Sequence, residues 1–130
     1  MDLRPEGGKP VHVFAVHLGT SFFERRHQAL RLLSPEILQD PNLNGPRILL
    51  GDFNEWTRGR VTQALSQELQ SADLRLHAKR RRSYPGVFPV WHLDHVYYDQ
   101  VLHLNRLWIH KTQISLIASD HLPLVAEFEL

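Results

Sequence analysis

The pattern of apolar and polar residues divides the chain into strand-like and helix-like segments. Residues 11–17 form a β-rich run that is apolar on both faces, as in a buried strand, and residues 47–50 form a second strand. Between them, Ser21 and Glu24 have the spacing of a capping box, so we expect a helix that runs to about Leu33. Its apolar face would comprise Phe22, Phe23, Ala29, Leu30 and Leu33.

The second half of the chain continues this pattern. A further helix carries an apolar face made of Val61, Ala64, Leu65 and Leu69. Residues 71–89 lack periodicity and are expected to be mostly loop. Two β-rich runs, residues 91–98 and 101–109, are joined closely at Asp99 and Gln100, which predicts a hairpin.

The last segment and the order of all segments define the fold class. Alternation over residues 124–130 predicts a half-buried final strand. Because strand, helix and strand in this spacing favour a right-handed crossover, the first two strands should be parallel. The pattern therefore predicts an α/β fold with a mixed β-sheet, element order β-α-β-α-β-β-β, and helices on one face.

Composition is that of an ordinary soluble domain. The 130 residues suffice for one domain with its own core, and 42% hydrophobic and 22% charged residues are typical values. No apolar stretch is long enough to span a bilayer, so no stable membrane insertion is expected. The absence of cysteine excludes disulfides and thiolate metal sites. With no visible signal peptide, this composition favours a cytoplasmic location.

Two short motifs indicate a chemical site. Gly51-Asp52-Phe53-Asn54 directly follows the apolar run that ends at Leu50, and Ser119-Asp120-His121 precedes the last strand. A carboxylate at the end of a buried strand can bind a metal ion or orient water, and an adjacent Asp-His pair adds a ligand and a titratable base. The first motif alone is equally typical of a turn. Its combination with the second favours a functional site.

The strand order predicts that the candidate side chains converge. His17 and Asp52 end two parallel strands, Asp94 lies early in its strand, and Asp120 and His121 immediately precede the last one. If the two later strands run antiparallel to the first pair, all five side chains reach the same edge of the sheet.

Four ordered motifs give the chain a resemblance to a known family. Residues 16–19, 51–54, 93–96 and 119–121 resemble, in order, the C-terminal half of endonuclease/exonuclease/phosphatase proteins. The resemblance implies half of a four-layer α/β/β/α sandwich. It also implies metal-dependent hydrolysis of phosphoester bonds, with Mg²⁺ or Mn²⁺ as the ion.

The resemblance also implies catalytic roles. His121 would act as the general base, and Asp94 would orient its imidazole and stabilise its charge. Asp52 would position the attacking water, and Asn54 would donate hydrogen bonds to the phosphoryl oxygens. His17 would contact the phosphate or the leaving-group oxygen.

Metal and substrate contacts follow from the same comparison. Asp120 would help to bind the divalent ion. Arg80, Arg81 and Arg82, which belong to one dense basic run, and Ser119 are candidate substrate contacts. Alternatively, His92 and His95, which flank Asp94, could be ligands of a zinc site.

The basic run and the aromatic residues after it favour a polyanionic substrate, hence the phosphodiesters of DNA or RNA. A phospholipid or inositol-phosphate phosphoesterase is the alternative substrate class. A further alternative is a non-catalytic binding module or inactive fragment that retains the fold.

The resemblance covers only one half of the family's domain, so residues 1–130 are expected to form a single partial domain. The family's first half, with its Asn and metal-binding Glu, has no counterpart here. Asp2-Leu3-Arg4 reads as the end of a strand, which indicates a piece of a longer protein. One apolar sheet face would then lack its partner. We expect homodimerisation through that face, or a missing N-terminal half supplied in trans.

Overall fold

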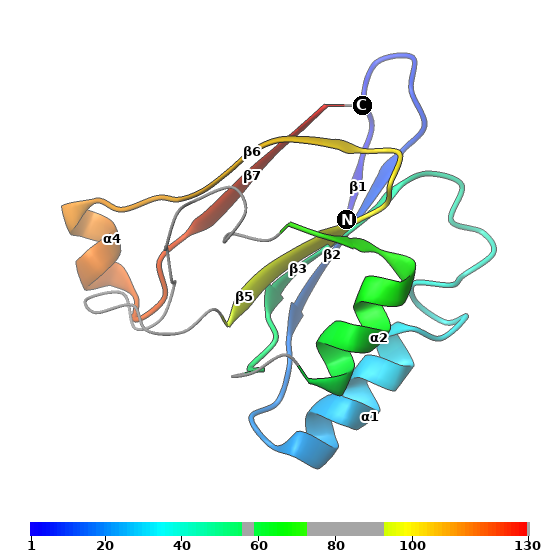
Figure 1. Ribbon diagram of the computed structural model, residues 1–130. Coiled ribbons are helices and arrows are strands. Elements are labelled where there is room, and N and C mark those ends of the chain that lie inside the picture. Colours follow the sequence, from blue (N-terminus) through cyan, green and yellow to red (C-terminus); the bar gives the residue numbers. More distant parts are fainter. Residues whose placement is uncertain (56–58, 73–92, 130) are drawn as a thin grey trace.

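The computed structural model describes residues 1–55, 59–72 and 93–129. A five-stranded sheet forms its centre, with strand order β1-β2-β3-β5-β4 (Figure 1). Its strands are β1 (Asp2–Leu3), β2 (Val11–His17), β3 (Arg47–Asp52), β4 (Gln70–Ser71) and β5 (Asp94–Tyr98). As the sequence predicts, β2 and β3 are parallel, whereas β5 runs antiparallel to β3. The sheet is therefore mixed.

Two helices cover one face of this sheet (Figure 1). They are α1 (Phe22–Leu32) and α2 (Arg60–Glu68). Ala29 and Leu32 of α1 and Val61 and Leu65 of α2 are buried in the cluster that also contains Leu49 of β3. This cluster fixes the helices to the sheet and with them the connections that leave its carboxyl end.

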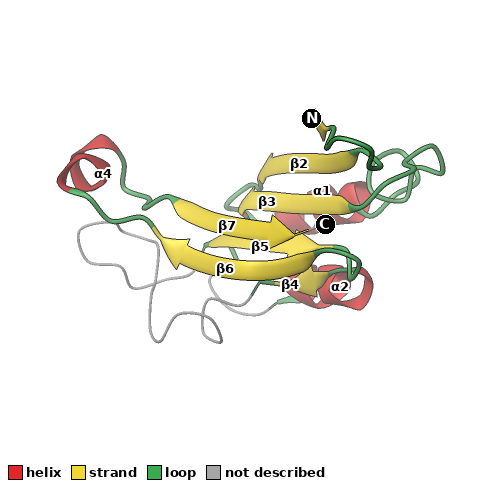
Figure 2. Cartoon of the chain, turned by 90° about the horizontal axis from the view of Figure 1, so that it is seen from above, coloured by secondary structure: helices red, strands yellow, loops and turns green. Residues whose placement is uncertain are grey.

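A second, two-stranded sheet lies over the opposite face (Figure 2). It pairs β6 (His103–Ile109) with β7 (Leu124–Glu129), and the short helix α4 (Gln113–Ala118) connects them. Leu104 and Leu107 of β6 share an apolar cluster with Ile48 and Val96 of the large sheet. The fold is thus α/β with three layers, and the predicted class is confirmed. In the described part of the chain, no helix is long and apolar enough to cross a membrane.

The predicted hairpin is wrong. A turn does follow β5, with the backbone N–H of Leu102 donating to the carbonyl of Asp99, but β5 and β6 belong to different sheets. Arg47 holds Asp99 at the end of the large sheet through two guanidinium contacts of 2.7 and 2.9 Å. The chain therefore crosses from one packed sheet to the other. Close spacing of two β-rich runs does not distinguish this crossing from a hairpin.

The start of α1 also departs from expectation. Ser21 is the N-cap, but its side chain makes no capping hydrogen bond, and the Glu24 side chain packs against Gly19 instead. Ala29 and Leu32 face the core, whereas Phe22, Phe23 and Leu30 are exposed. Phe23 and Leu30 are seven residues apart and share a stripe about 100° away from Ala29, because each residue advances a helix by that angle. The apolar face predicted for this helix is therefore wrong in these three residues.

Candidate active site

Strand register brings three candidate side chains to one end of the large sheet. His17 pairs with Asp52 across the parallel β2–β3 ladder, and Asp52 pairs with Asp94 across the antiparallel β3–β5 ladder. Gly51, with φ of +137°, lies against the carbonyl oxygen of Val16, where a side chain would clash with the neighbouring strand. The glycine before Asp52 therefore allows the two strands to stay close up to their last residues.

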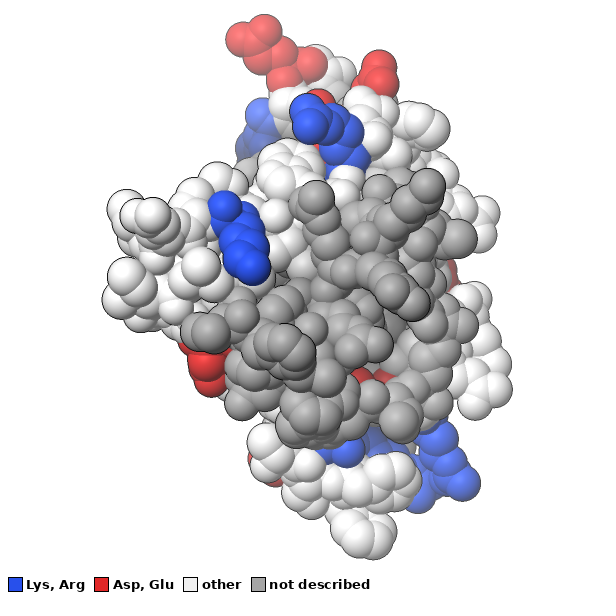
Figure 3. All heavy atoms as spheres, turned by 60° about the vertical axis from the view of Figure 1, so that its left-hand side comes forward, with Lys and Arg blue, Asp and Glu red and all other residues white. Residues whose placement is uncertain are grey.

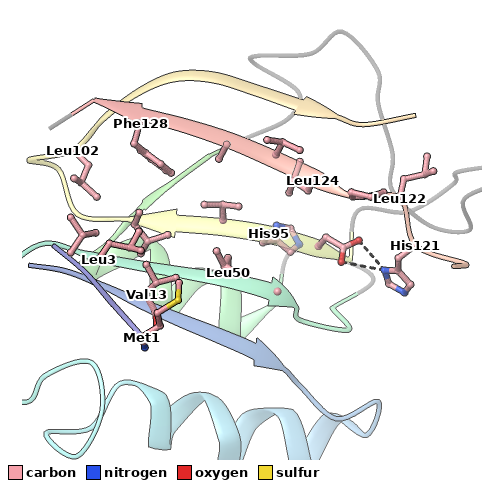
Figure 4. Close-up of a pocket in the computed structure, with 18 of the residues that line it drawn as sticks. Met1, Leu3, Val13, Leu50, His95, Leu102, His121, Leu122, Leu124 and Phe128 are labelled. Carbon is pink, nitrogen blue, oxygen red and sulfur yellow. Dashed lines mark hydrogen bonds and ion pairs between the residues drawn. The ribbon is translucent and has the colours of Figure 1, made fainter. Parts of the chain in front are cut away.

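His121 reaches this edge from the other sheet. It lies in the turn before β7, and its Nδ1 is 2.9 and 3.2 Å from the two carboxylate oxygens of Asp94 (Figure 4). Its backbone N–H donates to the hydroxyl of Ser119 at 3.1 Å, which fixes the turn. The predicted His121–Asp94 contact is confirmed. An ionised carboxylate only accepts hydrogen bonds, so the contact places a proton on Nδ1 and directs the acceptor behaviour of a neutral imidazole to Nε2.

Asp52 lies between two imidazoles. Its Oδ2 is 3.7 Å from Nε2 of His121 and 3.7 Å from Nε2 of His17. The Asp52 side chain is 14% exposed, whereas that of His17 is 78% exposed. Both separations are longer than a direct hydrogen bond, and a water between polar groups can bridge such a distance. The three side chains thus define a polar centre that is closed on the sheet side and open at His17.

The surroundings of His121 favour its protonated form. Partial burial acts to lower its pKa. The hydrogen bond that Nδ1 donates to Asp94, together with the charges of Asp94, Asp52 and Asp120, outweighs this effect and raises the pKa above its ordinary value. A higher pKa makes the neutral imidazole a stronger proton acceptor, which suits a proton-transfer group.

Asn54 ties two loops of the site together. The residue is buried and has φ of +48°. Its backbone N–H donates to Oδ1 of Asp52 at 2.8 Å, and its side-chain Nδ2 donates to the carbonyl of Leu18 at 2.7 Å. One amide hydrogen is therefore committed to the loop after His17. The predicted contact of Asn54 with phosphoryl oxygens stays a prediction.

Helix α1 holds the same loop from its other side. Oε1 of Gln28 accepts the backbone N–H of Gly19 at 2.8 Å. Nη1 of Arg25 donates to the carbonyl of Gly19 at 3.2 Å and also to that of Thr20. These contacts position the segment that follows His17. Sequence analysis missed them, although the half-buried Arg25 and Gln28 lie at the (i, i+3) spacing of one helical face.

The metal ligands are only partly accounted for. Asp120 is exposed beside His121, but no three His, Asp or Glu side chains within the described ranges are grouped closely enough to hold a metal ion. By themselves, therefore, these residues do not fit a complete metal site. Arg80, Arg81, Arg82 and His92 lie outside the described residues, which leaves both the substrate contacts and the zinc alternative as predictions. His95 packs its ring against Phe53 and Tyr97.

An apolar groove leads from the far end of the sheets to the His121–Asp94 pair (Figure 4). It has a volume of about 1040 Å³ and lies between the large sheet and the β6–β7 sheet. Leu50 and Val13 line it from one side, and Leu124 and Phe128 line it from the other. Leu3, near the chain start, is 48% exposed at its margin.

The three-layer fold, with a His–Asp pair and a second carboxylate at the sheet edge, defines a family. The sequence profile of the Endonuclease/Exonuclease/phosphatase family matches residues 2–121, and the chain belongs to this family. Its members are metal-dependent phosphoesterases and nucleases.

Several individual proteins are similar to this chain in sequence or in structure. Uncharacterized protein YbhP of Escherichia coli is 33% identical over 135 residues, which cover 97% of this chain and 49% of YbhP. A functionally unknown conserved protein from Enterococcus faecalis has a similar structure, with a TM-score of 0.75 and 25% identity, and the match covers 94% of this chain and 51% of that one. A mannosyl-6-phosphatase from Bacteroides thetaiotaomicron has the same fold, with a TM-score of 0.75, 20% identity, and coverage of 96% and 53%. The chain thus spans about half the length of the curated relatives it matches.

Proposed function

We propose that this chain contributes the acid–base half of a divalent-metal-dependent phosphoesterase site. The observation that supports this function is the pair of contacts around His121. Asp94 holds its Nδ1, and Oδ2 of Asp52 lies 3.7 Å from its Nε2. A water between Nε2 and Asp52 would be oriented by the carboxylate and would give its proton to the imidazole as it attacks phosphorus.

The other residues would act on the phosphate. His17 is exposed beside Asp52 and would contact a phosphoryl or leaving-group oxygen. The remaining amide hydrogen of Asn54 would donate to the same oxygens, while the first one holds the loop. In this proposal the Asp94 carboxylate stabilises the imidazolium that forms during attack.

Mg²⁺ or Mn²⁺ is the proposed ion, with Asp120 as the ligand from this part of the chain. One carboxylate is a weak site by itself, because such ions usually need one or two carboxylates and the substrate phosphate. When bound, the ion would stabilise negative charge on the phosphoryl group.

Hydrolysis of soluble nitrophenyl phosphomonoesters and phosphodiesters tests the function. We expect activity that EDTA removes and Mg²⁺ or Mn²⁺ restores. Replacing His121 by Ala should lower kcat/KM by roughly 10²–10⁴-fold, because a general base contributes about that factor. The matched control is His103→Ala, which removes an exposed imidazole on β6. No metal-dependent hydrolysis, or equal rates for the two variants, would leave a non-catalytic binding module as the better description.

The natural substrate would be a phosphodiester of nucleic acid, with a phospholipid or an inositol phosphate as the alternative class. The basic run that contains Arg80, Arg81 and Arg82 supports the first class. Binding of a single-stranded oligonucleotide should then weaken steeply as salt increases, since phosphate contacts release counterions. Affinity that does not change with salt argues against these contacts.

A further inference from the structure

Charged groups on the α4 side of the molecule are scattered over its described surface, with both signs present (Figure 3). Glu55 is used differently, because its carboxylate is directed back into the fold. The residue is half-buried and directly follows Asn54 of the site. Its Oε2 accepts the backbone N–H of Thr62 at 2.9 Å and also the hydroxyl of Thr62. Glu55 therefore joins the loop that follows β3 to helix α2.

This contact takes the place of the usual cap of α2. The N-cap residue is Gly59, which has no side chain to form a cap, and Thr62 is the third residue of the helix. A capping side chain normally accepts the N–H at that position. A Cβ at Gly59 would overlap Oε1 of Glu55, so the glycine makes room for the carboxylate. The acceptor for the start of α2 thus comes from the residue next to Asn54.

Asn54 needs an anchor on each side because its backbone is left-handed. Its φ is +48°, a region that is unfavourable for L-residues, although asparagine tolerates it better than most. The chain before it is fixed, since Phe53 is buried and its N–H donates to the carbonyl of Leu93 at 2.9 Å. The chain after it is fixed by Glu55. Such a conformation persists only where the surrounding structure maintains it.

The backbone angle of Asn54 decides where its side chain points. Rotation about the N–Cα bond moves Cβ together with the chain that follows. If Glu55 were free, Asn54 could relax to a negative φ, and its Nδ2 would leave the carbonyl of Leu18, to which it donates at 2.7 Å. A carboxylate outside the polar centre therefore controls the direction of an amide beside it.

We propose that Glu55 is a positioning residue of the site. By binding the start of α2, it maintains the left-handed backbone of Asn54 and thereby the direction of the Asn54 amide. Its catalytic consequence rests on the function proposed above, in which the second amide hydrogen of Asn54 donates to phosphoryl oxygens. The positioning itself does not, because it requires no turnover.

The side-chain NH₂ signals of Asn54 test the positioning by NMR on the whole chain, without substrate. In Glu55→Ala, the hydrogen bonded to Leu18 should shift upfield and exchange about tenfold faster or more, because its bond opens more often. Glu55→Gln keeps an oxygen acceptor for Thr62, so exchange should stay within about threefold of the wild type.

Ser66→Gly is the matched control. Ser66 is exposed in the same helix, and glycine there weakens α2 without touching the loop that follows β3. The Asn54 signals should stay where they are in this variant. The comparison separates a loss of helix stability from a loss of positioning.

Hydrolysis of a nitrophenyl phosphodiester with Mg²⁺ tests the catalytic consequence. Glu55→Ala should lower kcat by about tenfold and change KM by less than about twofold, because a misdirected donor loses contact mainly in the transition state. Glu55→Gln should restore most of kcat, and Ser66→Gly should change neither constant.

Two results would overturn the proposal. The first is an unchanged set of Asn54 signals in Glu55→Ala, and the second is an equal change in Ser66→Gly. If Glu55→Ala does not fold, Thr62→Val, which removes only the hydroxyl contact, should shift the same signals in the same direction, and no shift overturns the proposal. Shifted signals in a protein that hydrolyses no phosphoester would refute the proposed function and still support the positioning.

Discussion

His121 depends on Asp94 more than on any other side chain with a described contact to it. The hydrogen bond at 2.9 Å and the carboxylate charge oppose the effect of burial and raise the pKa of the imidazole. Asp94→Asn keeps the shape and removes the charge, so the pKa of His121 should fall. NMR titration of the imidazole signals measures this change, with the exposed His103 as internal control. An unchanged or higher pKa of His121 in the variant would contradict the assigned contact.

The same pairing predicts how stability depends on pH. A histidine whose pKa is higher in the folded state binds its proton more tightly there than in the unfolded chain. The resulting stabilisation is fully present below the unfolded pKa of about 6.5 and is lost as pH rises through the raised folded pKa of His121. Denaturant unfolding of wild type and Asp94→Asn should therefore differ more at acidic than at alkaline pH.

The connection from β2 to α1 is an element whose shape a single side chain maintains. Arg25 donates to the carbonyls of Gly19 and Thr20, whereas its neighbour Arg26 is exposed. Arg25→Ala should loosen this loop, speed amide exchange at Gly19, and lower kcat more than it raises KM. Arg26→Ala removes the same charge without the contacts and should leave exchange unchanged. Equal effects of the two variants would mean that general charge, not positioning, matters here.

The pairing of β2 with β3 near the site depends on one glycine. Gly51 has φ of +137°, and an added Cβ would meet the carbonyl of Val16. Gly51→Ala should lower the free energy of unfolding by roughly 2–4 kcal/mol, the sum of backbone strain and displacement. Gly7 also has positive φ but has open space around it, so Gly7→Ala should cost only about 1 kcal/mol. Urea unfolding of both variants measures the two changes in the free energy of unfolding.

The positions of helices and strands were easier to predict from the sequence than the strands with which each one pairs. The hydrophobic period located β2, α1, β3, α2 and β7, and strand order placed His17, Asp52 and Asp94 on one edge. The sequence did not predict that β6 and β7 form a separate sheet, because packing between sheets leaves the period of a strand unchanged. It also missed α4, whose six residues expose both isoleucines and bury a serine. The hydrogen bonds of Asn54 and Arg25 could not be predicted from the sequence, because only the folded chain brings their donors and acceptors together.

At the scale of the whole molecule, the apolar groove between the two sheets is open to solvent. A two-stranded sheet is marginal without further strands, and β6 and β7 pair only with each other among the described residues. We propose that a second copy covers the groove of the isolated chain, or that the first half of a longer protein does so in trans. The match to 49% of YbhP supports this proposal.

Light scattering after size-exclusion chromatography tests the covered groove. We expect the isolated chain, of 15.2 kDa, to elute as a dimer at micromolar concentration. Leu3→Glu places a charge at the margin of the groove and should shift the protein to monomer, whereas Val101→Glu, outside the groove, should not. A stable monomer that binds no hydrophobic dye would refute the proposal.

Association through the groove would also be coupled to proton binding at His121. Because it ends at His121 and Asp94, whatever fills it withdraws water from the imidazole, and burial acts to lower the pKa of His121. Association would then release protons near that pKa, and by linkage a higher pH would favour the associated form. The oligomeric state of the protein and the charge of its central histidine would therefore respond to each other, so that acidification alone would promote dissociation.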